Sequence, residues 1–231
     1  MEEKPKLLSF FDIASILLLI AASYLTLVFA PQEAVMGQVQ RVFYFHVSAG
    51  WVGMIGFFVA VVSGIFYLAK GEHKWDVAGL AGIELGLVFF FINIVTGSIW
   101  ARPIWNTWWT WDPRLVTATI VELVYIAYLM LRQGIEDPDR RARFGAIYAI
   151  VGFVSVPMTF LSIRIWRTIH PVVIGSSDPG AEGAFEMTAD MKTAFFFSLF
   201  TFTVIGITLV WHRIRLGNLA DKVEALKLKL M

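Results

Sequence analysis

Apolar stretches of about twenty residues alternate with short polar connections along this chain. There are six of them: Phe10–Ala30, Val47–Ala69, Val77–Trp100, Pro113–Leu131, Phe144–Ile163 and Thr193–Trp211. A helix of about 20 apolar residues crosses the roughly 30 Å of hydrocarbon in a bilayer. Because backbone polar groups in lipid must be satisfied within the segment, we predict that each stretch is a helix. The pattern therefore predicts an all-α integral membrane protein with six transmembrane helices in a single domain, residues 1–231.

The composition agrees with an integral membrane protein and excludes several kinds of site. Of the 231 residues, 58% are apolar and only 16% are charged, which is more apolar than an ordinary soluble domain. The formal net charge of +1 gives no indication of a nucleic-acid partner. Because the chain has no cysteine, disulfides, thiolate metal sites and iron–sulfur clusters are excluded. A metal or haem ligand must come from histidine, methionine or carboxylate side chains.

Lysine and arginine are distributed unevenly between the two sets of connections. Of the 19 such residues, thirteen fall on the side that carries both ends of the chain, and six fall on the other side. Cytoplasmic connections of membrane proteins are the richer in Lys and Arg, so we predict that both termini are cytoplasmic. The connections near residues 31–46, 100–112 and 164–191 then lie on the outer face.

The tail, residues 213–231, carries apolar side chains at helical spacing. Leu219, Val223, Leu226 and Leu230 recur every three or four residues, with Lys and Asp between them. This spacing predicts a short amphipathic helix on the cytoplasmic side. Such a helix either lies on the inner leaflet of the membrane or docks a cytoplasmic partner.

A Trp-rich segment, residues 100–115, lies on the predicted outer face between the third and fourth stretches. It contains five of the nine tryptophans, which are Trp100, Trp105, Trp108, Trp109 and Trp111. One interpretation is an aromatic belt that anchors the chain at the membrane interface. Belts, however, spread their rings among many helix ends, whereas these rings fall close together. We therefore favour a platform of flat aromatic faces that holds a ligand.

The spacing inside the Trp-rich segment predicts its local structure. Trp105, Trp108, Trp109 and Asp112 are spaced i, i+3, i+4 and i+7, which would place them on one face of a short helix. Pro113 suits the first position of the next helix. Asp112 is then expected to cap that helix at its N-terminus.

Two of the four histidines are candidate metal ligands. His46 and His170 lie at the outer ends of the second and fifth stretches, at the same depth as the tryptophans. Neutral imidazole is a good ligand for haem iron. Taken alone, each of them is also explained as a hydrogen-bonding residue of the interface. His73 and His212 lie at cytoplasmic ends, where a polar residue needs no special role.

Arginines on the outer face are candidates for binding a carboxylate. Arg102, Arg114 and Arg167 stand in or near the Trp-rich segment and His170. The planar guanidinium group pairs with a carboxylate through two parallel hydrogen bonds. The alternative is that each arginine binds lipid phosphate and orients its connection.

Two polar residues lie inside the apolar stretches. Asn93 is in the third stretch and Glu122 is in the fourth, each a few turns from the outer end. Ionisable groups within a membrane usually face the interior of the helix bundle. We therefore predict a hydrogen bond between these two side chains across adjacent helices.

The Trp-rich segment, which ends in Trp111-Asp112-Pro113-Arg114-Leu115, resembles the WWD signature of the haem-handling membrane proteins of cytochrome c biogenesis. Two flanking segments match as well: residues 41–47, which contain His46, and residues 166–170, which end in His170. Six spans and this chain length are similar to the cytochrome c maturation protein C (CcmC, haem exporter protein C) family. The resemblance covers nearly the whole chain.

The resemblance implies both a site and a function. His46 and His170 would be the two axial ligands of a haem b, bound transiently as cargo against the WWD segment. The family presents haem at the periplasmic face of the cytoplasmic (inner) membrane to a periplasmic haem chaperone, together with ABC transporter subunits and a small membrane subunit. It is a carrier rather than an enzyme. The candidate haem-binding residues are His46, His170, Trp100, Trp105, Trp108, Trp109, Trp111, Asp112, Arg102, Arg114 and Arg167.

Two other functions are compatible with the residue pattern. One is a b-type cytochrome subunit of a membrane redox enzyme, which usually needs paired ligands for a haem within the bilayer and often two such sites. Only one histidine pair, His46 and His170, shares the outer face here, so transmembrane electron transfer would lack a second haem. The other is a structural subunit without haem, in which the tryptophans serve as membrane anchors.

Overall fold

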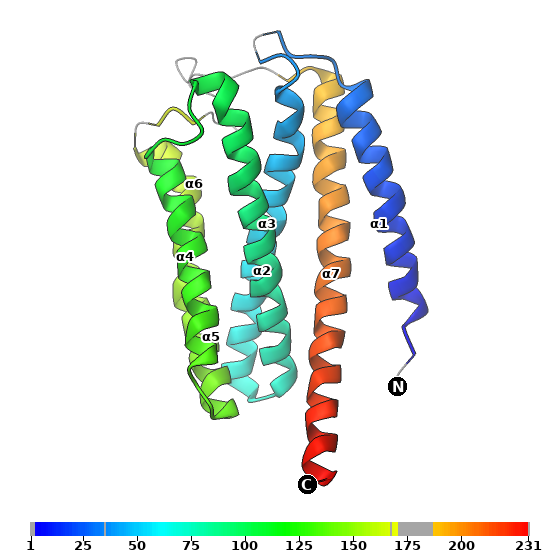
Figure 1. Cartoon of the computed structure of the whole chain (residues 1–231), viewed down its shortest axis with the longest axis vertical. Coiled ribbons are helices and arrows are strands. Elements are labelled where there is room, and N and C mark those ends of the chain that lie inside the picture. The colour runs from blue at the N-terminus through cyan, green and yellow to red at the C-terminus, as the bar shows by residue number, and fades with distance from the viewer. Residues whose placement is uncertain (1–2, 35, 167, 171–186, 231) are drawn as a thin grey trace.

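The computed structural model describes residues 3–34, 36–166, 168–170 and 187–230, and the helices in these ranges run alongside one another as one bundle (Figure 1). α1 is followed directly by a π-helical turn, η1. The elements are α1 (Lys6–Tyr24), η1 (Leu25–Phe29), α2 (Gln40–Lys70), α3 (His73–Trp105), α4 (Pro113–Gln133), α5 (Pro138–Gly152), α6 (Ser155–Ile165) and α7 (Ala189–Leu230).

The prediction of six membrane-spanning helices is confirmed by length and composition. Among the described residues, six helical segments are long and apolar enough to cross a membrane, with α1 and η1 forming one of them and α5 and α6 another. The chain breaks between α5 and α6 at Phe153, four residues before Pro157. A proline ring clashes with the carbonyl four residues earlier, so Pro157 accounts for this break. The described part of the chain contains no β-strand.

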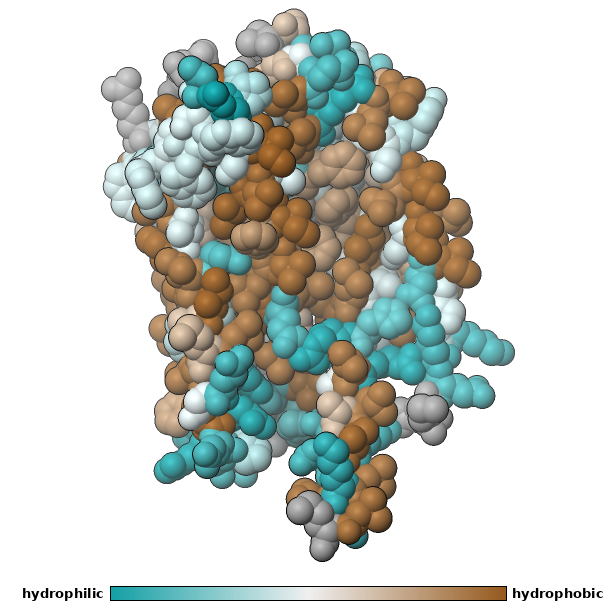
Figure 2. All heavy atoms as spheres, in the orientation of Figure 1, coloured by the Kyte–Doolittle hydropathy of each residue, from teal (hydrophilic) through white to brown (hydrophobic). Residues whose placement is uncertain are grey.

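The surface has the layering that a membrane-spanning bundle requires. Apolar side chains cover the middle of the visible face, and hydrophilic residues gather at the lower end (Figure 2). Large apolar side chains such as Ile16 and Phe91 are more than half exposed. Both ends of the chain lie at the lower end of the bundle, and the connection between α3 and α4 lies at the upper end (Figure 1).

The core of the bundle is built around the close approach of α2 and α3. A Cβ atom on Gly56 would lie 2.6 Å from the carbonyl oxygen of Gly82, so any larger residue would force these helices apart. Next to this crossing, Phe57 of α2 stacks on Tyr125 of α4, with the ring centroids 3.9 Å apart. Gly56 and Gly82 therefore serve helix packing.

Two charged pairs join helices in the half of the bundle that holds the termini. Arg132 of α4 donates to both carboxylate oxygens of Asp76 on α3, at 2.5 and 2.8 Å, and both side chains are about nine-tenths buried. Arg213 of α7 forms an ion pair with Glu84 of α3. A buried carboxylate or guanidinium requires such a partner, because the uncompensated charge is costly away from water.

The predicted hydrogen bond between Asn93 and Glu122 is wrong. Asn93 Nδ2 instead donates to the carbonyl oxygen of His46, at 2.8 Å. Glu122 Oε2 is buried without a hydrogen-bond partner among the described residues. The sequence indicates the depth of each polar residue in the bundle, but the rotation of its helix decides which neighbour it faces.

The short helix predicted within the Trp-rich segment is also wrong. α3 continues through Trp105, and Asn106 then adopts a left-handed conformation with a φ of 54°. Asparagine tolerates this conformation, which ends the helix. Residues 106–112 form an irregular connection, so the tryptophans do not share one helical face.

The tail is helical as predicted, but it is not a separate helix. α7 runs without a break from Ala189 to Leu230, and its C-terminal part extends past the other helices (Figure 1). This geometry favours a tail that is available to a partner over one that lies flat on the membrane.

Candidate functional site

A pocket lies at the end of the bundle that carries the Trp-rich segment. Its lining encloses about 560 Å³ of space, the open solvent at its mouth included. Its walls come from α2, α3, α4 and α6, together with the α3–α4 connection and the segment that ends at residue 170. Six of the predicted site residues line it: His46, His170, Trp100, Trp105, Trp109 and Arg114.

His46 is held firmly against α3. Its Nδ1 lies 2.9 Å from the carbonyl oxygen of Asn93 and 3.3 Å from the hydroxyl of Thr96. A carbonyl can only accept, so this contact requires the tautomer with the hydrogen on Nδ1 and the lone pair on Nε2. This is the arrangement seen in metal-binding histidines, whose second ring nitrogen donates to a carbonyl or carboxylate. The side-chain amide nitrogen of Asn93 lies 3.1 Å from Nδ1 and 3.4 Å from Nε2.

Glycine at position 97 makes room for the imidazole of His46. A Cβ atom on Gly97 would lie 2.8 Å from His46 Cε1, closer than a non-bonded contact allows. Together with the hydrogen bonds from Asn93, this contact determines where the ring lies. The position of His46 in the pocket is therefore set by α3 as well as by its own helix.

Asp112 links the start of α4 to the segment that carries His170. Its Oδ1 accepts from the backbone N–H of Arg114 at 2.9 Å, which is the predicted N-cap, with Pro113 at the first helical position. Its Oδ2 accepts from the backbone N–H of Ile169 at 3.0 Å. Asp112 does not line the pocket; it places the residue next to His170.

The aromatic side of the pocket is made of rings packed edge to face. Trp100 and Trp105 meet at 90° with centroids 5.2 Å apart, and Trp100 is only 6% exposed. The ring of His170 lies 6.3 Å from that of Trp105. Such edge-to-face packing fixes each ring in place.

Arg114 is the arginine that lines the pocket. Its Nη1 donates to the carbonyl oxygen of Thr159, and its guanidinium group lies 4.6 Å from the ring centroid of Phe160 on α6. A guanidinium group has five N–H donors, so donors remain for an anionic ligand group. Among the described residues, no group of three or more His, Asp or Glu side chains is arranged to hold a metal ion. His46 and His170 are the two histidines that line this pocket.

Comparison with known proteins matches residues 2–229 to the family described as "Heme exporter protein C". The chain belongs to this family. Relatives of that name include a Bradyrhizobium diazoefficiens protein, 31% identical over 157 residues, and a Rhodobacter capsulatus protein, 30% identical over 167 residues. An Escherichia coli relative is 29% identical over 191 residues. These alignments cover 68%, 72% and 81% of this chain, and 60%, 69% and 74% of the respective relatives.

Several residues predicted for the site of this family member lie outside the pocket. Trp108 and Trp111 are 58% and 78% exposed, and neither lines it. Arg102 is turned toward the end of α3, where its Nη1 donates to the backbone and side-chain oxygens of Asn106 at 2.5 and 2.6 Å. Arg167 lies outside the described residues.

Two pocket residues that contact His46 were not predicted as part of the site. Asn93 and Gly97 stand one turn apart on α3 and both contact His46. Asn93 could have been predicted as a site residue, because it is a polar residue within an apolar stretch. The sequence did not indicate a role for Gly97 in the site, because a single glycine in a membrane helix is more often explained by helix packing.

Proposed function

We propose that this chain binds haem in the pocket and presents it at the periplasmic face for transfer to a periplasmic haem chaperone during cytochrome c maturation. It acts as a carrier, since the pocket offers ligands, stacking surfaces and a cation rather than a set of catalytic groups. The whole six-helix chain serves as one haem-handling domain. Membership of the Heme exporter protein C family supports haem as the cargo.

The observation that carries this proposal is the geometry of His46. With the hydrogen on Nδ1 donated to the Asn93 carbonyl, Nε2 keeps a lone pair that an iron could take in place of its 3.4 Å contact with Asn93 Nδ2, in the same pocket as His170 and three tryptophans. Haem is a flat apolar disc with a metal at its centre. The pocket combines two imidazoles with aromatic walls, and that combination suits haem b ligated by two histidines.

Arginine side chains supply the positive charge that would pair with the haem propionates. Arg114 lies in the pocket wall and is the first candidate. Arg102 and Arg167, which neighbour the Trp-rich segment and His170, are further candidates for contact with the bound haem. A paired arginine–carboxylate contact would orient the disc as well as add affinity. Trp108, Trp111 and Asp112 then support the rim of the site rather than its wall.

The orientation in the membrane follows from charge. The end of the bundle that holds both termini carries most of the Lys and Arg, so it is the cytoplasmic end, and the pocket faces the periplasm across the inner membrane. A site near the surface leaves the haem edge accessible to a soluble chaperone. The exposed flanks of the bundle would contact lipid, ABC transporter subunits and a small membrane subunit.

The alternative function, a b-type cytochrome subunit, finds less support in the geometry. His73 and His212 are paired with Asp221 and Asp12 at the opposite end of the bundle, and each is substantially exposed. They do not form a second site for a haem. Electron transfer across the membrane would lack its second redox centre.

The absorption spectrum of the purified full-length protein, supplied with haem, tests the proposal. We expect a Soret band in the wild type, reduced haem retention in His46→Ala and His170→Ala, and normal retention in His73→Ala and His212→Ala. Equal haem content in all four variants would refute the ligand assignment. A stable haem that is rapidly reduced by quinols would identify a redox subunit, and failure of an apo-chaperone to remove haem would refute the carrier role.

A further inference from the structure

The C-terminal part of α7 carries a row of exposed apolar side chains at the end of the bundle opposite the pocket. Their exposed fractions range from 44% to 88%. The row, called the α7 seam below, consists of Leu216, Leu219, Val223, Leu226 and Leu230. Their spacing of three, four, three and four residues is that of the a and d positions of a heptad, which pack against a second helix.

Contacts with α3 turn the α7 seam away from the bundle. A Cβ atom on Gly217 would lie 2.7 Å from Val77 Cγ1, so this side of α7 is pressed against α3. One turn later, Asp221 Oδ2 lies 2.8 Å from His73 Nε2 at the start of α3. With 3.6 residues per turn, positions 217 and 221 face the side opposite the seam. The seam is therefore held outward by contacts on the back of the same helix.

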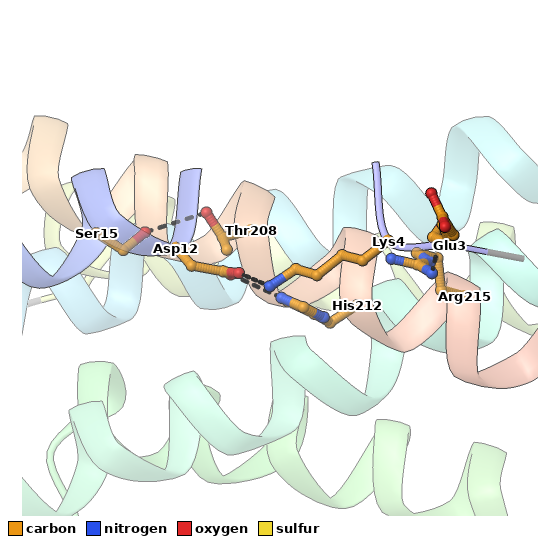
Figure 3. Close-up of polar contacts among 7 residues, drawn as sticks. All are labelled: Glu3, Lys4, Asp12, Ser15, Thr208, His212 and Arg215. Atoms are coloured by element: carbon orange, nitrogen blue, oxygen red, sulfur yellow. Dashed lines mark hydrogen bonds and ion pairs between the residues drawn. The ribbon is translucent and has the colours of Figure 1, made fainter. Parts of the chain in front are cut away.

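The α7 seam continues a face of α7 that already packs against a helix. Higher on α7, Thr208 lies 3.1 Å from the hydroxyl of Ser15, and His212 Nε2 lies 2.7 Å from Asp12 Oδ1 (Figure 3). Positions 208, 212, 216 and 219 follow one another along the same side of the helix. α1 covers this side above the seam and begins at Lys6. A further helix placed in line with α1 would cover the seam in the same way.

Basic residues flank the α7 seam on both sides. Arg215, Lys222 and Lys229 occupy the positions on one side, and Lys227 stands on the other. A second copy of this chain would bring lysine against lysine in either a parallel or an antiparallel pairing, because both flanks are basic. Like charges at these positions disfavour pairing, whereas opposite charges select a partner.

We propose that the α7 seam docks an amphipathic helix of a partner protein with an apolar stripe flanked by Asp and Glu. Such a helix buries the five apolar side chains and pairs its carboxylates with the flanking Lys and Arg. The partner acts at the end of the bundle remote from the pocket, so docking is independent of haem. The unbroken course of α7 favours a protein helix over a lipid surface, because lying on the membrane would require a bend after the span.

Binding of a designed peptide to the full chain in nanodiscs tests this proposal. The probe is a fluorescent four-heptad peptide with Leu at the a and d positions and Glu at the flanking positions; the matched peptide has Lys there. We expect fluorescence anisotropy to show binding of the Glu peptide only. Leu219→Asp and Leu226→Asp should weaken binding by about tenfold or more.

Leu228→Asp is the matched control. Leu228 is also exposed, at 69%, but it lies on the opposite side of α7 from the seam. This variant should bind the Glu peptide as the wild type does, and equal losses in all three variants would refute the proposal. Equal binding of both peptides, or of neither, would also refute it. Dimerisation abolished by Leu226→Asp would assign the seam to a second copy, and loss of peptide binding only in anionic nanodiscs would assign it to lipid.

Discussion

The Asp112 carboxylate lies 3.0 Å from the backbone nitrogen of Ile169, the residue that precedes His170. The same carboxylate caps α4 through the backbone N–H of Arg114. One side chain therefore ties the start of a helix to a segment 57 residues further along the chain, next to a proposed haem ligand. Asp112 thus links the backbone beside His170 to the start of α4.

Replacing Asp112 by alanine should impair haem binding more than it impairs folding. The loss of an N-cap costs about 1 kcal/mol of stability. The loss of the contact with Ile169 releases the His170 segment, and by analogy with outer-shell partners of metal ligands, we expect haem affinity to fall about 10–100-fold. Haem titration followed at the Soret band measures this.

Asp137→Ala is the matched control for this prediction. Asp137 precedes Pro138 and caps α5, accepting from the backbone N–H of Arg140 at 2.7 Å, so it repeats the Asp–Pro arrangement away from the pocket. This variant should lose similar stability and keep its haem affinity. If both variants lose haem equally, the contact with Ile169 has no specific role.

Gly97→Ala should weaken haem binding by displacing His46. The added methyl group would lie 2.8 Å from His46 Cε1, so the ring must move or rotate. We expect a weaker Soret band and a shift in its position, because the axial ligand is altered. Gly79→Ala on the same helix is the control, since its Cβ meets nothing closer than 3.4 Å. Unchanged spectra in Gly97→Ala would show that the packing of His46 on α3 does not matter for the site.

The fold could be predicted from hydropathy because lipid permits few structures. Six apolar stretches have to be helices when no water is present to satisfy the backbone. The ends of the helices were less predictable: α3 begins at His73 and runs to Trp105, beyond the predicted Val77–Trp100. Polar and aromatic residues at helix ends continue the helix into the interface. Hydropathy does not predict the secondary structure of such residues.

The candidate site could be predicted in its residue types but only partly in its contacts. His46 and His170 were recognised from their shared depth, and they do line one pocket. Asn93 was recognised as a buried polar residue, yet it pairs with His46 rather than with Glu122. Rotation about the helix axis decides such partners, and it depends on packing between helices that are distant in sequence.

Breaking the buried pair between Asp76 and Arg132 should destabilise the bundle. The two side chains are 10% and 8% exposed, so Asp76→Ala leaves a buried guanidinium without its carboxylate. Removing one partner of a buried pair typically costs about 3–5 kcal/mol. Thermal unfolding in detergent should show a clear fall in Tm. Glu224→Ala, which breaks an exposed pair with Lys227, should cost at most about 1 kcal/mol, and a similar fall in both variants would contradict this reasoning.

Replacing a tryptophan that lines the pocket should reduce haem binding more than replacing an exposed tryptophan of the same segment. Trp105 lines the pocket between Trp100 and His170, so Trp105→Ala removes a wall and the edge-to-face contacts that hold both neighbours. Trp111 is 78% exposed and lies outside the pocket, so Trp111→Ala should retain haem at the wild-type level. Haem content per chain after purification distinguishes the two variants. Equal losses would mean that the tryptophans act together as one surface, and that the bound haem extends beyond the pocket to the exposed rim.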